Sequence, residues 1–195
     1  MSVQLLRRKF TVEQYHTMVL SGIISEDDRV ELIRGEIVEM SPPSQQHAAY
    51  VRRLNILFSE KLRNFHCHRF GSRALVDIQN SVELDDFSEP QPDIALLQPR
   101  EDFYEAGHPQ PGDIFLIVEV ADTTLKYDRH VKIPLYAEEN IVEVWLVDLN
   151  EQCVEVYREP TPNGYQTVQK FGEGQNLSIQ AFSDVEITVD EVLGQ

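Results

Sequence analysis

The stretch LIVEVAD, residues 116–122, places one glutamate, Glu119, between apolar residues on both sides. A short, continuous apolar run of this kind is typical of a β-strand that is buried on both faces. An ionised carboxylate is costly to bury alone, so Glu119 requires a partner. The identity of that partner decides whether the strand has a structural or a functional role.

Length and composition indicate one globular domain. The chain has 195 residues, of which 42% are hydrophobic and 26% charged, so we expect a single domain over residues 1–195 with a sizeable core. No apolar run reaches the roughly 18 residues of a membrane span, and the N-terminus lacks the apolar core of a signal peptide. Cys67 and Cys153 stand far apart and form no metal-type pair. A reduced, cytoplasmic compartment is therefore expected.

The charge is strongly acidic but unevenly distributed. The net charge is −16, which argues against a protein that coats nucleic acid through bulk electrostatics. Residues 1–70 hold 10 Lys+Arg against 8 Asp+Glu, whereas residues 71–195 hold 7 against 25. A polyanion would therefore have to approach the N-terminal part, or be brought in by a bound metal cation.

Periodicity predicts an α/β domain with a mixed sheet, led by helices and ended by hairpins. Thr11 and Gln14 form a capping-box pattern at the start of one helix, and apolar residues recur every three or four positions in the next. Helices are expected over residues 11–22, 47–65 and 123–138, where Pro134 should strain or kink the last. Strands are expected on both sides of an Arg34-Gly35 turn, then at 73–79, 93–97 and 114–120, in a hairpin over 141–159, and in the tail segments GYQTVQKF, NLSIQAF and VEITV.

Two acids stand in consecutive strands. Asp93 follows Pro92 in QPDIALL, and Glu119 lies in the next apolar strand. If these strands are neighbours, the two carboxylates can converge at one edge of the sheet, where they repel each other unless a cation or a proton lies between them. Oxygen ligands of this kind suit Mg²⁺ or Mn²⁺.

A lysine beside these acids would complete a hydrolytic site, because it could polarise or deprotonate an attacking water. Position 121 should face the same way as Glu119, but it is Ala121. The following helix offers Lys132, which shares a face with Asp128 and Tyr136. If that helix packs over its own strand, the Lys132 ammonium can reach the site. Lys126, nearer the helix start, is the weaker candidate.

These residues resemble the core of a PD-(D/E)XK nuclease with its lysine moved to the adjacent helix. More narrowly, the chain resembles the Uma-type family of restriction endonucleases, which is abundant in cyanobacteria. The resemblance covers most of the chain and includes VELIRGEIVEMSPPSQQH (30–47), QPDIALL (91–97), LIVEVADTT (116–124) and IVEVWLVD (141–148), together with the spaced Asp128, Lys132 and Tyr136.

The resemblance implies a restriction-endonuclease-like fold, with a mixed central sheet flanked by helices and additional hairpins at the C-terminus. It implies a Mg²⁺- or Mn²⁺-dependent endonuclease acting on nucleic acid, with DNA as the expected substrate. Asp93, Glu119 and the Val120 carbonyl would be metal ligands, Lys132 would orient the water, and Glu31 would help complete the site. A homodimer follows by analogy alone. One departure is Ala121-Asp122-Thr123, where family members commonly carry serine and proline; the extra acid makes the approach of a phosphate backbone less favourable.

Structural alternatives remain open at each position. Asp93 could cap a turn, Glu119 could pair with an arginine such as Arg73, and Lys132 could pair with Asp128 on an exposed face. Glu31 could face solvent, with Glu36 as its rival for the site. His47, which also falls in the matched segment, could do no more than start a helix.

Two alternatives to the nuclease also remain. The acidic charge favours a catalytically silent member of the fold that binds a basic protein partner. An enzyme that acts on a smaller phosphoester is the other.

Overall fold

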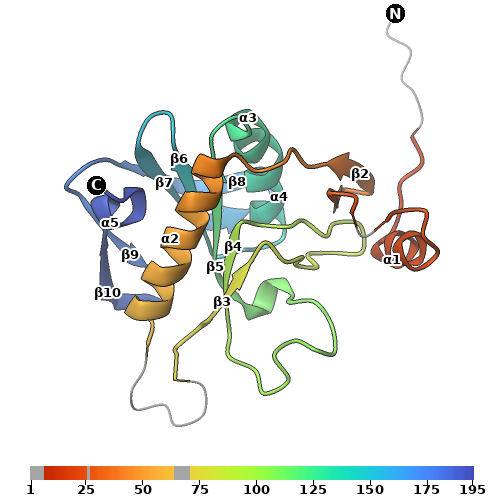
Figure 1. The fold of residues 1–195 in the computed structure, drawn as a ribbon, viewed down its shortest axis with the longest axis horizontal. Helices are drawn as coiled ribbons and strands as arrows, with labels where there is room; N and C mark the ends of the chain where they lie inside the picture. The colour runs from red at the N-terminus through yellow and green to blue at the C-terminus, as the bar shows by residue number, and fades with distance from the viewer. Residues whose placement is uncertain (1–6, 26, 64–70) are drawn as a thin grey trace, which may run out of the picture.

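A six-stranded mixed sheet forms the centre of the molecule (Figure 1). The computed structural model describes residues 7–25, 27–63 and 71–195. The strands follow the order β3-β4-β5-β6-β7-β8, and only β5 and β6 are parallel neighbours. Their bounds are β3 Leu75–Ile78, β4 Ile94–Leu97, β5 Ile114–Ala121, β6 Glu143–Asp148, β7 Cys153–Thr161 and β8 Gly164–Phe171. The mixed sheet is as the sequence predicts, and β4 and β5 are neighbours, which is the condition for Asp93 and Glu119 to converge.

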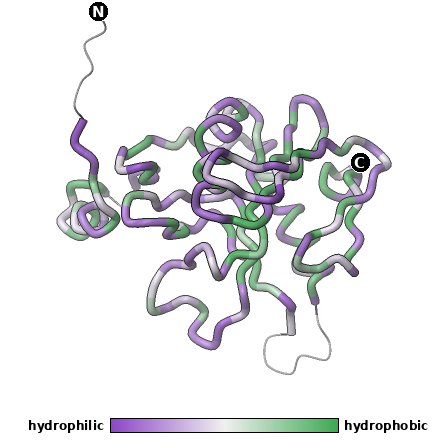
Figure 2. The backbone as a smooth tube through the Cα atoms, turned by 180° about the vertical axis from the view of Figure 1, so that it is seen from behind, coloured by the Kyte–Doolittle hydropathy of each residue, from purple (hydrophilic) through white to green (hydrophobic). Residues whose placement is uncertain are grey.

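Alternation along β4 and β5 divides the core into two clusters. One face packs against α2, Gln45–Lys61, through Ile94, Leu96, Leu116, Val118 and Val120. The opposite face packs against α4, Ile133–Glu138, through Ala95, Leu97, Ile117 and Ala121. Figure 2 shows hydrophobic segments concentrated along the strands in the middle of the molecule. Because side chains alternate along a strand, Glu119 points to the α4 face together with Ile117 and Ala121.

The N-terminal elements form a small cluster at one end of the molecule (Figure 1). Helix α1, Val12–Leu20, begins at Thr11 with the predicted capping box to Gln14. Strands β1, Val30–Ile33, and β2, Glu36–Glu39, pair around the predicted turn, where both Arg34 and Gly35 have positive φ. The backbone of Glu89 bonds to that of Leu32, which ties this hairpin to the segment before β4.

The crossover from β5 to β6 is helical over residues 125–138, close to the predicted range, but it is not α-helical throughout. It consists of α3, Leu125–Tyr127, a π-helical turn, Asp128–Lys132, and then α4. Pro134 lies in the first turn of α4 and cannot donate the backbone hydrogen bond of a regular helix. The π turn places one extra residue just ahead of this proline, which fits the predicted strain at this point of the helix.

The C-terminal segment covers the α2 side of the sheet. Strands β9, Asn176–Ile179, and β10, Phe182–Thr188, form the predicted short hairpin, and the short helix α5, Val189–Leu193, packs on α2. Helix α5 was not predicted from the sequence. Helix α2 ends at Lys61 rather than near residue 65, and Phe65 and Cys67 lie outside the described residues. Within the described part of the chain, no helix combines the length and the apolar character of a membrane span.

Candidate active site

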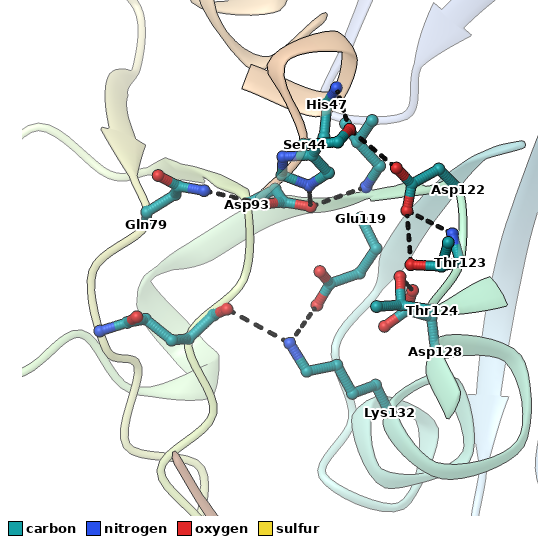
Figure 3. Close-up of polar contacts among 12 residues, drawn as sticks. Ser44, His47, Gln79, Asp93, Glu119, Asp122, Thr123, Thr124, Asp128 and Lys132 are labelled. Carbon is teal, nitrogen blue, oxygen red and sulfur yellow. Dashed lines mark hydrogen bonds and ion pairs between the residues drawn. The ribbon is translucent and has the colours of Figure 1, made fainter. Parts of the chain in front are cut away.

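Asp93 and Glu119 stand opposite each other on neighbouring antiparallel strands. The register pairs Ile94 with Val118, which places the preceding residue, Asp93, level with Glu119. Residues directly opposite in an antiparallel pair lie on the same face of the sheet. Figure 3 shows their two carboxyl groups directed toward a common space.

The Asp93 carboxylate is held by three donors from different segments. Its Oδ2 accepts hydrogen bonds from the Val120 backbone N–H at 2.9 Å and from His47 Nε2 at 3.0 Å. Its Oδ1 accepts from Gln79 Nε2 at 3.2 Å. Asp93 therefore contacts three other segments of the chain and does not only cap its own turn.

The Val120 carbonyl faces the Asp93 side of β5. The carbonyl of the next residue, Ala121, accepts from Leu149 N at 2.9 Å on the β6 side. Successive carbonyls of a strand point in opposite directions, and the N–H and C=O of one residue point the same way. Because the Val120 N–H bonds to Asp93, its carbonyl is directed to that side too.

Glu119 meets a lysine, not an arginine. Its Oε1 accepts from Lys132 Nζ at 3.1 Å and from the Tyr136 hydroxyl at 2.5 Å, and all three side chains are buried. Its Oε2 accepts no hydrogen bond from the residues that the structure describes. Arg73, the alternative partner, instead forms an ion pair with Asp184 at 2.7 Å.

The charges around Glu119 shift several pKa values. Burial raises the pKa of Glu119 to about 8, against the opposing effect of the Lys132 ammonium. The charges of Asp128 and Asp93 add to this increase. Burial alone would lower the pKa of Lys132, but the surrounding carboxylates, Glu119 first among them, raise it above its ordinary value. Lys132 is therefore an ammonium ion at neutral pH.

Glu31, not Glu36, reaches this cluster. Glu31 Oε2 lies 3.2 Å from Lys132 Nζ and accepts from Gln91 N at 3.0 Å, while its Oε1 accepts from the Tyr127 hydroxyl at 2.9 Å. The Gln91 carbonyl also accepts from Lys132 Nζ, at 3.2 Å. Glu36 is exposed and pairs with Arg7.

Asp128 and Lys132 are buried, so the interpretation of an exposed pair is wrong. Asp128 Oδ2 accepts from the Thr124 hydroxyl at 2.7 Å, and burial raises the pKa of Asp128 to about 6. Lys126 is exposed. The predicted shared face of Asp128, Lys132 and Tyr136 is confirmed.

His47 and Gln79 contact the site, although the sequence analysis assigned neither to it. His47 lies in the first turn of α2, whose N-cap Ser44 also donates from its hydroxyl to Asp122 at 2.9 Å. The hydrogen bond to Asp93 raises the pKa of His47, and its buried Nδ1 has no partner among the described residues. Gln79 follows β3 directly, in the left-handed region with φ of 52°. The sequence signal for Gln79 was a polar residue at the end of a strand that precedes the strand of Asp93.

A pocket of about 550 Å³ opens where these segments meet. Its lining includes Glu31, Ser44, His47, Gln79, Asp93, Glu119, Asp122, Asp128 and Lys132. The oxygen donors of Asp93 and Glu119 fit a hard divalent cation, which keeps several waters and needs only one or two protein carboxylates. Within the described residues, two groups of three potential metal-binding side chains have ligand atoms within 4.8 Å of one another, and neither includes Asp93 or Glu119. The pocket therefore fits an ion that keeps several waters better than an ion enclosed by protein ligands alone.

The six-stranded mixed sheet with its flanking helices is a restriction-endonuclease-like fold. A family model described as "Uma2: Putative restriction endonuclease" matches residues 12–190. The chain belongs to this family.

A solved structure shares the fold. The crystal structure of a "putative nuclease belonging to DUF820" from Anabaena variabilis ATCC 29413 is similar with a TM-score of 0.70 and 18% sequence identity. The similarity covers 95% of this chain and 98% of that chain. A comparison with curated proteins finds no match.

Proposed function

We propose that this protein is a divalent-metal-dependent endonuclease that hydrolyses phosphodiester bonds in nucleic acid, with DNA as the expected substrate. One observation carries the proposal: two acids from neighbouring strands face one pocket, and the Lys132 ammonium lies 3.1 Å from one of them. We further propose that residues 1–195 act as a single domain.

Asp93, Glu119 and the Val120 carbonyl are the proposed ligands of Mg²⁺ or Mn²⁺. Restriction-endonuclease-like nucleases generally use divalent metals. The fit rests on oxygen donors, on the pocket beside them, and on a buried glutamate whose Oε2 is not used by another described residue. A bound dication supplies positive charge that offsets the charge developing on the attacked phosphate.

Lys132 is the proposed residue that orients the attacking water. Because its pKa is raised, Lys132 is suited to donate hydrogen bonds as an ammonium ion rather than to take a proton. Glu31 and the Gln91 carbonyl also contact its Nζ, each at 3.2 Å. Glu31 is therefore a positioning residue in this proposal.

The acidic lining of the pocket favours binding of a cation before binding of a phosphate group. Glu31, Glu39, Asp122 and Asp128 also line this pocket. Its described lining contains one arginine, Arg29, and one lysine, Lys132. A phosphate group would be repelled until a dication reduced the local negative charge.

Metal binding is the first test. Isothermal titration with Mn²⁺ should show binding to the wild type, and Asp93→Asn and Glu119→Gln should each weaken it by at least about 10–100-fold. Asp102→Asn, which changes an exposed acid paired with Arg100, is the matched control and should bind as the wild type does. A wild type that binds no Mn²⁺, or an Asp93→Asn variant that binds it equally well, would overturn the proposal.

Cleavage is the second test. Supercoiled plasmid, single-stranded DNA, RNA and a dinucleotide should be incubated with the protein and Mn²⁺, with Glu119→Gln as the negative control. DNA cleavage lost in the variant supports the endonuclease, and cleavage of the dinucleotide alone indicates an enzyme for smaller phosphoesters. Metal binding without any cleavage favours a catalytically silent, partner-binding member of the fold. Light scattering tests the proposed homodimer, in which two sites would address two strands.

A further inference from the structure

A second cluster of potential metal ligands lies outside the active site. His16 comes from α1, Glu89 from the segment that pairs with β1, and His108 from the loop before the 3-10 helix Pro111–Asp113. Their ligand atoms all lie within 4.8 Å of one another. Three segments far apart in sequence thus direct two imidazoles and one carboxylate to a single point.

Each oxygen of the Glu89 carboxylate faces a different histidine. Oε2 lies 2.6 Å from His16 Nε2, and Oε1 lies 3.9 Å from His108 Nε2. The two imidazole rings have centroids 5.7 Å apart. In a tetrahedral site with bonds of about 2.0–2.1 Å, neighbouring ligand atoms lie about 3.3 Å apart. The 2.6 and 3.9 Å separations, which are measured to the two different oxygens of Glu89, fall on either side of that value.

The burial of Glu89 calls for a cation. Its side chain is only 4% exposed, and its ion-pair partners among the described residues are these two histidines, with no lysine or arginine. Histidine is not a permanent cation as lysine and arginine are, so a buried carboxylate paired only with histidines is a suitable ligand for a metal ion. A dication bound between the three side chains would supply the missing charge.

The cluster is also open to ions from solution. The side chains of His16 and His108 are 40% and 42% exposed. His16 lines one surface hollow and His108 another. The backbone of Glu89 is fixed by bonds to Leu32, so the carboxylate is held in place while the two histidines can adjust.

We propose that His16, Glu89 and His108 form a second metal site, selective for a borderline transition-metal dication, with Zn²⁺ as the best fit. Two histidines and one carboxylate with a fourth, solvent-facing position are a known ligand set for Zn²⁺, and imidazole favours Zn²⁺ over Mg²⁺. The ion links α1, the Glu89 segment and the His108 loop. Because the Glu89 segment continues directly to Gln91, this site supports one wall of the active-site pocket.

The test uses tag-free Asp93→Asn protein, in which the proposed active-site ion is disfavoured. Zn²⁺ at about 100 times its Kd should raise the Tm by about 5–10 °C. Co²⁺ should give the visible absorption bands of a tetrahedral site, and Zn²⁺, but not Mg²⁺, should abolish them. Neither the Tm shift nor the Co²⁺ absorption requires nuclease activity, so this test is independent of the proposed function.

Variants at the exposed histidines locate the ion. In the same background, His16→Gln and His108→Gln should each weaken Zn²⁺ binding by at least about 10–100-fold, and circular dichroism should show an unchanged fold. His130→Gln alters another exposed histidine and should leave the affinity within about twofold of the parent. If the parent shows no Zn²⁺-dependent shift, or if the shift persists in the His16→Gln/His108→Gln double variant, the cluster is only a hydrogen-bonded histidine–glutamate pair and the proposal is wrong.

Discussion

Glu119 and Glu143 are two buried glutamates of the same sheet with different surroundings. Both are the third residue of the same tetrapeptide, since IVEV occurs at residues 117–120 and again at 141–144. Glu143 Oε1 accepts from Arg158 Nη2 at 2.6 Å and from Trp145 Nε1 at 2.9 Å, and its Oε2 accepts from Gln180 N at 2.6 Å. Both of its oxygens are used, whereas only one oxygen of Glu119 accepts hydrogen bonds from described residues.

The difference follows from which face of the sheet each residue occupies. The register pairs Ile117 with Val144, both of which belong to the core cluster under α4. Glu119 is on that face and Glu143 is on the α2 face with Trp145. A buried acid in an apolar strand is therefore not by itself a sign of function. What distinguishes Glu119 is a pocket, a second acid on the neighbouring strand, and a lysine in place of an arginine.

Removing the cation of Glu143 should produce the largest loss of stability. Arg158→Met leaves a buried carboxylate without its ion pair, at a cost of about 3–5 kcal/mol in the free energy of unfolding. Lys170→Met, which breaks an exposed pair with Glu151, is the control and should cost at most about 1 kcal/mol. Urea unfolding measures both. Equal losses would mean that the buried pair of Glu143 is no stronger than an exposed pair.

The free energy of unfolding should depend on the protonation of Asp128. This side chain is buried, and the nearby Lys132 ammonium also pairs with Glu31 and Glu119. The pKa of Asp128 in the folded protein, about 6, lies above its ordinary value of 3.8. Its contribution to the free energy of unfolding is therefore fully present below pH 3.8 and is lost as pH rises through 6. The gap corresponds to about 3 kcal/mol. Urea unfolding in EDTA from about pH 4 to pH 7 should show this loss in the wild type but not in Asp128→Asn. A variant that loses stability in parallel with the wild type would refute the assignment, and Asp102→Asn serves as the exposed control.

The hydroxyl of Tyr136 should be worth more than that of a tyrosine bonded to a neutral group. Tyr136→Phe removes the bond to Glu119, at a cost of about 1.5–3 kcal/mol when the acceptor is ionised. Tyr165→Phe removes a bond to the Ile141 carbonyl and should cost about 0.5–1.5 kcal/mol. The comparison is made above the Glu119 pKa of about 8, by thermal or urea unfolding. Identical costs would show that Glu119 holds its proton there.

The smallest effect is expected at Arg73. Arg73→Gln breaks an ion pair with the exposed Asp184, so it should cost no more than about 1 kcal/mol and leave Mn²⁺ binding unchanged. Unfolding curves and calorimetry measure the two quantities. A loss as large as that of Arg158→Met would mean that burial of the carboxylate does not set the strength of these pairs.

The sequence predicts the parts of the site that depend on local spacing. Asp93 and Glu119 stand in consecutive apolar strands, which favours neighbouring positions in a sheet, and Lys132 lies four residues from Asp128 and from Tyr136. The parity of β5 correctly places Ala121 on the side of Glu119.

The parts that were missed depend on long-range packing. His47 and Gln79 reach Asp93 only because α2 and β3 flank β4 in the folded chain. The choice of Glu31 over Glu36 depends on how the β1–β2 hairpin docks, since both are single glutamates in short strands. A search for helical periodicity does not detect the π turn, because the four-residue spacing of Asp128, Lys132 and Tyr136 is also that of one face of a regular α-helix.

That one extra residue has a consequence for how the protein can change over evolution. Each residue advances a helix by about 100°, so deletion of one position within Asp128–Lys132 would turn every later side chain of α4 by that angle relative to β5. An ammonium group and a phenol now aimed at the sheet would point elsewhere while the strands stayed paired. A single-codon deletion would thus separate these two groups from the buried carboxylate of β5, and a single insertion would restore the contact.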